Sequence, residues 1–169
     1  MVHPEKNIQL LEPKTLQGIP FVAGLLIILI FAVQRILPFQ TYIIFLLVLL
    51  FNRDSRFLRV LIAPGISFVL LSVFRGYNNA PRPYQEFDIE PIIVKGTQGK
   101  SFPSRHVFSA FLISMTLYYI SVPIGISLML IGSAIATIRV IGGVHFPRDV
   151  IAGALMGILF GIIGWNLRI

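Results

Sequence analysis

A run of 33 residues without Asp, Glu, Lys or Arg, 106–138, constrains this chain more than any other feature. A hydrocarbon core of about 30 Å is crossed by about 20 helical residues, so the run is too long for one comfortable crossing. The segment 121–125, Ser-Val-Pro-Ile-Gly, lies near its middle and contains the two residue types that most often mark turns. We therefore expect two short membrane helices joined there by a tight hairpin.

Four other uncharged runs have lengths suited to membrane helices. The longest fills the 20 positions between Lys14 and Arg35, and the others are 36–52, 60–74 and 150–167. Together with the hairpin they predict an all-α, polytopic integral membrane bundle of six transmembrane helices. A helix running straight through the central run would leave five.

The composition indicates a single membrane domain over residues 1–169. Charged residues make up 12% of the sequence, against about 25% in a typical soluble domain. This excludes a disordered chain and a large soluble domain. We expect residues 1–17 to form an interfacial N-terminal arm and 75–104 to form a polar loop at the outer face. The absence of cysteine excludes disulfide and thiolate chemistry.

The net charge of +7 comes from 14 Lys and Arg against 7 Asp and Glu. In a membrane protein, contact between basic loops and anionic lipid headgroups explains this excess better than a nucleic-acid partner. Because cytoplasmic loops are rich in Lys and Arg, the cations outside the uncharged runs predict that both termini are cytoplasmic. The cations used for this assignment are Lys6, Lys14, Arg53, Arg56, Arg59 and Arg168.

Seven further cations fall on the opposite, outer side of this topology, against the same rule. They are Arg75, Arg82, Lys95, Lys100, Arg105, Arg139 and Arg148. Either the topology is wrong or an anionic ligand binds at the outer face. We favour the ligand, since Arg side chains match phosphate oxygens bidentately.

The segment before the longest uncharged run predicts an anion site. Ser104 follows Pro103 and is expected at the N-cap of the helix. The backbone amides just after it have no intrahelical acceptor, which makes such a helix start suitable for binding phosphate. His106 falls in the first turn, where its imidazole can give or take a proton near neutral pH.

A second polar segment follows the hairpin. Arg139 ends the next helix near membrane depth, where an ionisable residue is a functional candidate by default. Two glycines then end the helix, and His145 precedes Pro147, which suits the start of the last helix. Asp149 is close enough in sequence to hydrogen-bond one nitrogen of His145, which would make the other nitrogen a nucleophile.

These residues predict phosphoryl transfer through a phosphohistidine. His145 attacks phosphorus, the arginines hold the equatorial oxygens, and His106 protonates the leaving alkoxide before water releases the phosphate. Two His and one Asp among arginines would repel a cation, so we expect no metal and no cofactor. The two histidines can share a phosphate only if an even number of crossings separates them, which requires the hairpin.

The polar segments resemble the three signature motifs of the type 2 phosphatidic acid phosphatase superfamily of membrane lipid phosphatases. The family's first motif is Lys, six residues, Arg-Pro, and residues 75–83 follow this spacing. Its second is Pro-Ser-Gly-His, matched by 103–106, and its third is Ser-Arg, five residues, His, three residues, Asp, matched by 138–149. Order and internal spacing agree throughout.

Three positions depart from the motifs: Arg75 replaces Lys, Arg105 replaces Gly and Ile138 replaces Ser. None of these changes removes the nucleophile, its partner or the acid. Arg105 adds bulk and charge beside the phosphate site and is expected to alter which headgroups fit. The resemblance implies catalytic roles for His145, His106 and Asp149, and phosphate binding by Arg75, Arg82, Ser104 and Arg139. For Arg105, which the motif lacks, our hypothesis is phosphate binding through a second phosphate, as in a pyrophosphate substrate.

The resemblance also implies a substrate class and a location. We expect a phosphorylated lipid, such as phosphatidylglycerol phosphate, phosphatidic acid or undecaprenyl pyrophosphate, to reach an outer-face site in a bacterial cytoplasmic membrane. A transporter, or a lipid-binding protein that keeps the phosphate site without turnover, is the alternative. The apolar runs argue against the related soluble haloperoxidases. The glycines at 153, 157 and 161 are expected to pack against a neighbouring helix within the bundle rather than in a dimer.

Overall fold

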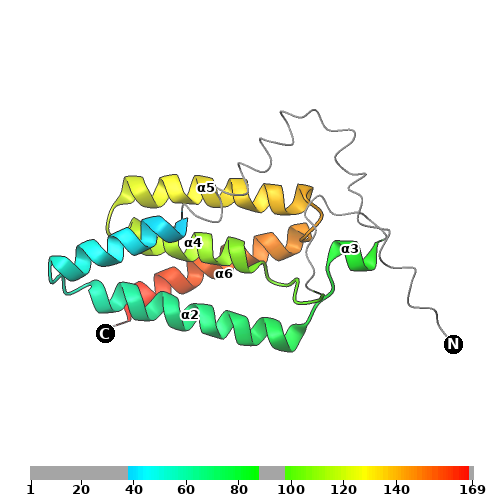
Figure 1. Ribbon diagram of the computed structural model, residues 1–169, viewed down its shortest axis with the longest axis horizontal. Helices are drawn as coiled ribbons and strands as arrows, with labels where there is room; N and C mark the ends of the chain where they lie inside the picture. The colour runs from blue at the N-terminus through cyan, green and yellow to red at the C-terminus, as the bar shows by residue number, and fades with distance from the viewer. Residues whose placement is uncertain (1–37, 88–97, 168–169) are drawn as a thin grey trace, which may run out of the picture. The chain divides into compact units, whose positions relative to one another are not determined.

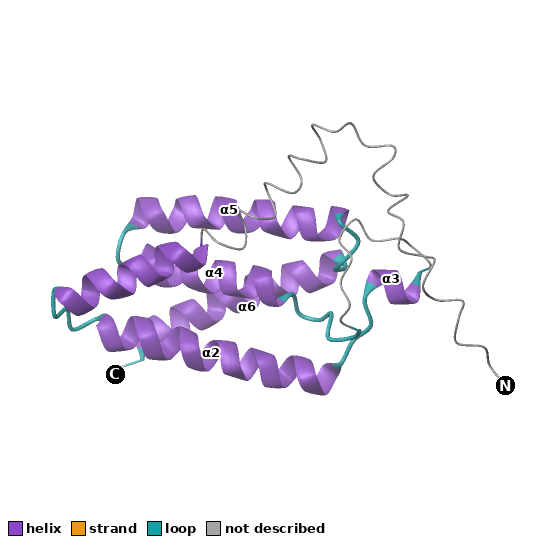
Figure 2. Cartoon of the chain, viewed as in Figure 1, coloured by secondary structure: helices purple, strands orange, loops and turns teal. Residues whose placement is uncertain are grey.

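The computed structural model describes residues 38–87 and 98–167, and this part of the chain is all-α. Figure 1 shows the helices lying roughly side by side, and Figure 2 shows the loops that join them. The predicted first membrane helix and the N-terminal arm lie outside the described residues. The helices are Pro38–Phe51, α2 Phe57–Asn78, α3 Pro83–Glu86, α4 Arg105–Tyr118, α5 Val122–Ile141 and α6 Pro147–Asn166.

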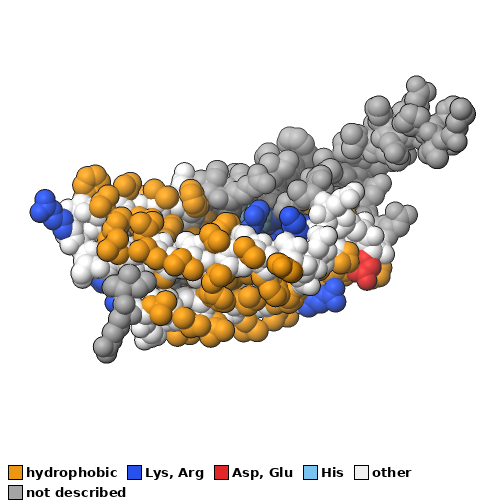
Figure 3. Space-filling model, turned by 90° about the horizontal axis from the view of Figure 1, so that it is seen from below, with side chains coloured by type: hydrophobic (Ala, Val, Ile, Leu, Met, Phe, Trp, Pro, Cys, Tyr) orange, Lys and Arg blue, Asp and Glu red, His pale blue; other side chains and the backbone are white. Residues whose placement is uncertain are grey.

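Three helical segments of the described chain are long and apolar enough to cross a membrane: Phe57–Glu86, Val122–Ile141 and Pro147–Asn166. The helix Pro38–Phe51 is apolar but shorter. With 14 residues, α4 is about 21 Å long, which is less than the hydrocarbon thickness. Hydrophobic side chains cover most of the face in Figure 3, and Lys and Arg show only in a few separate places on it.

The predicted hairpin is confirmed. α4 ends at Tyr118 and α5 begins at Val122, with Pro123 in the first turn, where a missing N–H costs nothing. α4 and α5 therefore run antiparallel, and α6 returns in the direction of α4 (Figure 1). As a result the first turns of α4 and α6 and the last turn of α5 all lie at one end of the bundle.

α2 is longer than the predicted run 60–74, because it continues through Arg75 to Asn78. Arg75 therefore lies in the last turn of a helix and not in a loop. Asn79 ends the helix in the left-handed region, with φ 37°, and donates its N–H to the carbonyl of Arg75. The charge of Arg75 suggested an earlier end, but its side chain is buried by the polar segments that pack on it.

α4 is the central helix of the bundle and packs against α2, α5 and α6. Val107, Phe108 and Leu117 are fully buried along its length. The ring of Phe108 meets that of Phe160 from α6 edge to face, with 5.8 Å between centroids. The start of α4 is consequently held rigidly at the polar end of the bundle.

Glycines on α6 let its backbone approach α4 closely. A Cβ at Gly153 would lie 2.8 Å from the carbonyl oxygen of Ser104, and one at Gly157 would lie 2.6 Å from that of Phe108. A Cβ at Gly161 would lie 2.6 Å from the Met115 Cβ. The predicted packing of this stripe within the bundle is confirmed.

Gly157→Ala is expected to destabilise the protein by about 1–3 kcal/mol, because the added methyl group must push two backbones apart. Thermal unfolding in detergent, followed by circular dichroism, measures the effect. Gly65→Ala is the matched control, since nothing lies within 4 Å of a Cβ there and Ala is the better helix former. Equal melting temperatures for the two variants would show that the α4–α6 contact is not tight.

Candidate active site

The three polar segments meet at the end of the bundle where α2 ends and α4 and α6 begin. The N–H of Ser104 donates to the carbonyl of Asp149 over 2.9 Å and joins the two helix starts directly. Both helices point their N-terminal, partially positive ends at the same place. The main chain alone therefore favours an anion here.

A buried cluster of His145, Asp149 and Ser101 lies beside these helix starts. His145 is 2% exposed, and its Nδ1 lies 3.5 Å from Oδ2 of Asp149. The predicted pairing is present because Asp149 stands in the first turn of α6, one turn after His145. Oδ2 also accepts a hydrogen bond of 3.1 Å from the N–H of Phe146, which orients the carboxylate.

Ser101 is the member of this cluster that the sequence did not reveal as functional. Its hydroxyl donates a short hydrogen bond to Oδ2 of Asp149 and lies 3.3 Å from Nδ1 of His145. The side chain is completely buried. The one sequence signal was its place two residues before Pro103, inside a segment rich in functional residues.

Burial, with smaller contributions from the nearby cations Arg82 and Arg75, lowers the pKa of His145 to about 4. The hydrogen bond to Asp149 acts in the opposite direction and is outweighed. The imidazole is therefore neutral at pH 7. With Nδ1 facing the carboxylate and the serine, the lone pair of a neutral ring is left on Nε2.

Arg75 and Arg82 hold the loops of the site together through backbone carbonyls. Arg75 donates to the carbonyls of Lys100 and Ser101. Arg82 donates to the carbonyl of Gly99 over 3.0 Å and to that of Val144 over 3.2 Å. Because a guanidinium has five N–H donors, these contacts occupy only part of each side chain.

Arg139 occupies the last turn of α5 and is 3% exposed, as its position near membrane depth suggested. Its carbonyl accepts hydrogen bonds from the N–H groups of Val144 and His145, over 3.3 and 3.2 Å. Gly143 makes this tight turn possible, with φ 68°. The main chain at Arg139 thus sets the position of His145.

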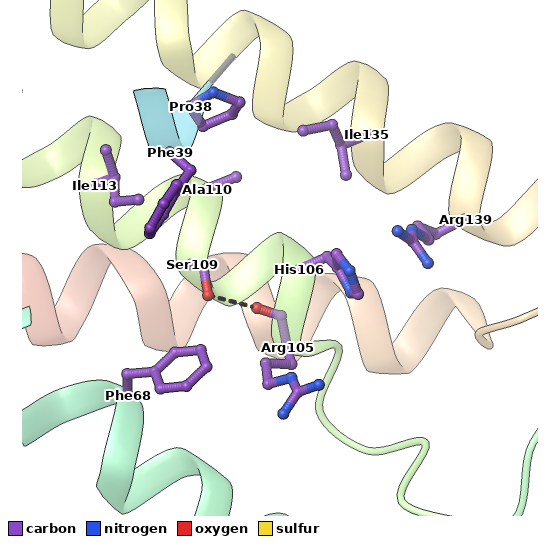
Figure 4. Close-up of a pocket in the computed structure, with 10 residues that line it drawn as sticks. All are labelled: Pro38, Phe39, Phe68, Arg105, His106, Ser109, Ala110, Ile113, Ile135 and Arg139. Atoms are coloured by element: carbon purple, nitrogen blue, oxygen red, sulfur yellow. Dashed lines mark hydrogen bonds between the residues drawn. The ribbon is translucent and has the colours of Figure 1, made fainter. Parts of the chain in front are cut away.

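His106 and Arg139 line a cavity of about 340 Å³ together with Arg105. Figure 4 shows His106 projecting from α4 toward the side where Arg139 of α5 lies, while Arg105 extends toward Phe68. The remaining walls are mostly apolar and include Phe39, Phe68 and Ile135. The cavity thus has a polar part at the helix starts and an apolar part farther along the bundle.

Ser104 stands at the N-cap of α4, as predicted, but its side chain makes no capping hydrogen bond. Its buried Oγ has no hydrogen-bond partner within the described residues. The structure therefore brings the hydroxyl to the anion site and leaves it available to a ligand there. No group of three His, Cys, Asp or Glu side chains in the described part of the chain has the geometry of a metal site.

Residues 56–168 match the PAP2 superfamily. The chain belongs to this superfamily. All three motifs fall within the matched region, and the two helix starts that meet at the site carry the second and third of them.

Two solved structures resemble this chain over most of its length. LpxE of Aquifex aeolicus has a TM-score of 0.69 and 28% identity, covering 85% of this chain and 87% of that one. A PAP2 type phosphatidylglycerolphosphate phosphatase of Bacillus subtilis has a TM-score of 0.70, covering 87% of this chain and 77% of that one. At 21% identity the second shows the likeness of fold alone. The apolar helices of the described chain are those of an integral membrane protein.

The chain is also similar to the bacitracin transport permease protein BcrC of Bacillus licheniformis. The two are 34% identical over 79 residues. The matched region covers 45% of this chain and 39% of that protein, so the chain spans about two fifths of this relative.

Proposed function

We propose that this PAP2 protein is a lipid phosphate phosphatase that needs no metal and hydrolyses a phosphate monoester or pyrophosphate of a membrane lipid. The observation that carries the proposal is the buried cluster of His145, Asp149 and Ser101 at two helix starts. A neutral imidazole held by a carboxylate is an activated nucleophile. Phosphatidylglycerol phosphate, phosphatidic acid and undecaprenyl pyrophosphate are the candidate substrates.

The reaction proceeds in two displacements. Nε2 of His145 attacks phosphorus, the bond to the leaving oxygen breaks, and His106 donates a proton to that oxygen. Asp149 stabilises the positive charge that develops on the attacking imidazole. Water then attacks the phosphohistidine, His106 takes its proton, and inorganic phosphate leaves.

The phosphoryl oxygens bind at the cationic part of the site. Ser104, Arg105 and Arg139 supply donors at the start of α4 and the end of α5, while Arg75 and Arg82 supply the N–H groups not bound to carbonyls. The two helix starts add backbone amides. Fixed donors of this kind stabilise the spread negative charge of the phosphoryl transition state.

We further propose six transmembrane helices in a bacterial cytoplasmic membrane, with both termini cytoplasmic and the site at the outer face. Support comes from the cations Arg53, Arg56 and Arg59, which lie at the end of the bundle away from the site. Asp54 pairs with Arg56 over 2.6 Å there, and hydrogen bonds from Arg56 lower the pKa of Asp54 to about 2. This end thus carries a net positive charge, as a cytoplasmic loop does.

A transport function is the second candidate, because the similar BcrC is described as a transport permease. A transporter also places arginines at membrane depth. It has no need of the pairing between His145 and Asp149, and the two candidates therefore differ in their dependence on that pair.

Phosphate release by the purified protein in detergent micelles tests the proposal. EDTA is present, and the three candidate lipids are compared for wild type and His145→Ala. We expect release from at least one lipid that persists in EDTA and is lost in the variant. Absence of release from every lipid, with anion flux into proteoliposomes that survives His145→Ala, would instead establish transport. Tight lipid binding without release or flux would establish a binding protein.

A further inference from the structure

The cavity that contains His106 continues into an apolar groove. The groove has a volume of about 310 Å³ and is formed by helix Pro38–Phe51, α2 and α4. Phe39 and Phe68 line both the cavity and the groove. Under the proposed function, on which this inference rests, the reacting phosphate lies at the polar end and the lipid chain lies in the groove. The headgroup atoms between them must pass Phe68.

Arg105 stands at this junction. It is the first residue of α4, its side chain is exposed in the cavity, and its Cζ lies 5.8 Å from the ring centroid of Phe68. Within the described parts of the chain, no carboxylate forms an ion pair with it. Its charge is therefore held over an aromatic ring, between the reacting centre and the apolar groove.

The other cations of the site have different surroundings. Arg75 and Arg82 are buried and bind backbone carbonyls of the loops. Both lie within electrostatic range of Arg105, which repels them. Arg105 thus adds a further positive charge to this cluster, and a ligand with more negative charge than one phosphoryl group, which carries about −1.5 to −2, would balance it.

We propose that Arg105 binds a second phosphoryl group on the leaving-group side of the reacting phosphorus, so that the site prefers lipid diphosphates to lipid monophosphates. A guanidinium suits this role because its planar fork binds phosphate oxygens in pairs. The family motif has glycine at this position, which could make no such contact. Arg105 is thus a specificity-determining residue of this particular chain.

The position of Arg105 next to His106 fixes which phosphoryl group it binds. His145 attacks the terminal phosphorus, and the bond between that phosphorus and the bridging oxygen breaks. The electron pair stays on the bridging oxygen, so a lipid monophosphate leaves, with a proton from His106 if that oxygen needs one. Arg105 binds this departing phosphate as its charge increases, and water later releases the terminal group as inorganic phosphate.

The test compares farnesyl diphosphate with farnesyl monophosphate, which differ only in the second phosphoryl group. The ratio of their kcat/KM values is measured for wild type, Arg105→Gln and Arg105→Lys. We expect Arg105→Gln to lower this ratio by roughly 10- to 100-fold, the range for losing a hydrogen bond to a charged group. The ratio for Arg105→Lys should lie between those of wild type and Arg105→Gln, because lysine keeps the positive charge but lacks the planar fork of a guanidinium.

Arg53→Gln is the matched control, since it removes an exposed positive charge at the far end of the bundle. An unchanged ratio in Arg105→Gln, or an equal fall in Arg53→Gln, would overturn the assignment of Arg105. His145→Ala separates this failure from failure of the proposed function. If phosphate release from both lipids depends on His145 but the ratio is unchanged in Arg105→Gln, the proposed phosphatase function holds and only the proposed specificity is wrong.

Discussion

Replacing His145 with alanine is expected to lower phosphate release by about 10⁴-fold or more. The variant removes the attacking nitrogen, and free water is not positioned to attack phosphorus in its place. Because the pKa of His145 is about 4, its ring is neutral at the working pH. The substitution therefore removes a nucleophile that is fully deprotonated. Initial rates of phosphate release in micelles measure the effect.

His106→Ala is the informative comparison for this experiment. His106 donates a proton to the leaving oxygen, so its loss should matter less for p-nitrophenyl phosphate, whose leaving group needs little protonation. With that substrate His106→Ala should still form a phosphoenzyme, and His145→Ala should form none. A phosphoenzyme in His145→Ala would place the nucleophile elsewhere, provided that circular dichroism shows the helices intact.

Asp149→Asn is expected to lower kcat by about 10³- to 10⁴-fold, as loss of the carboxylate does in other His–Asp pairs. Oδ2 of Asp149 faces Nδ1 of His145 and accepts hydrogen bonds from Ser101 and Phe146. An amide cannot balance the charge that forms on the imidazole during attack. The NH₂ group of the asparagine is also a donor, and it would face the hydroxyl of Ser101 or the N–H of Phe146, which now donate to the carboxylate.

The pKa of His145 provides a second way to measure the effect of Asp149→Asn. The hydrogen bond that His145 donates to Asp149 raises this pKa, so Asp149→Asn should lower it below about 4 and weaken the nucleophile. Histidine resonances in ¹⁵N NMR report the shift. Ser101→Ala keeps the carboxylate and serves as the comparison, with a much smaller loss of kcat expected. Equal losses in the two variants would show that the hydroxyl supports His145 as much as the carboxylate does.

The order of the helices followed from local sequence properties. The uncharged run 106–138 predicted the break that the structure places between Tyr118 and Val122, because Pro and Gly disfavour a continuous helix there. Pro147 predicted the start of α6 in the same way. The helix end predicted at Arg75 was wrong, because α2 continues to Asn78. A charged residue indicates the end of a membrane helix only when solvent, and not protein, surrounds its side chain.

Motif spacing also identified most of the candidate site. His145 and Asp149 are four residues apart, so one turn of helix brings them together. Ser101 could not be placed in this cluster, because it lies 44 residues from His145 in sequence. The carbonyls that bind the arginines are similarly remote, with 62 residues between Arg82 and Val144.

The sequence by itself determined the membrane character, the hairpin and the family, since these depend on hydrophobic length, turn residues and short-range spacing. Only the tertiary structure decided that Arg75 and Arg82 bind loop carbonyls, that Ser101 joins the His145 cluster and that Arg105 stands between the site and an apolar groove. The reason is physical. Those contacts join groups that are far apart in the sequence, and no local pattern specifies which distant groups will meet.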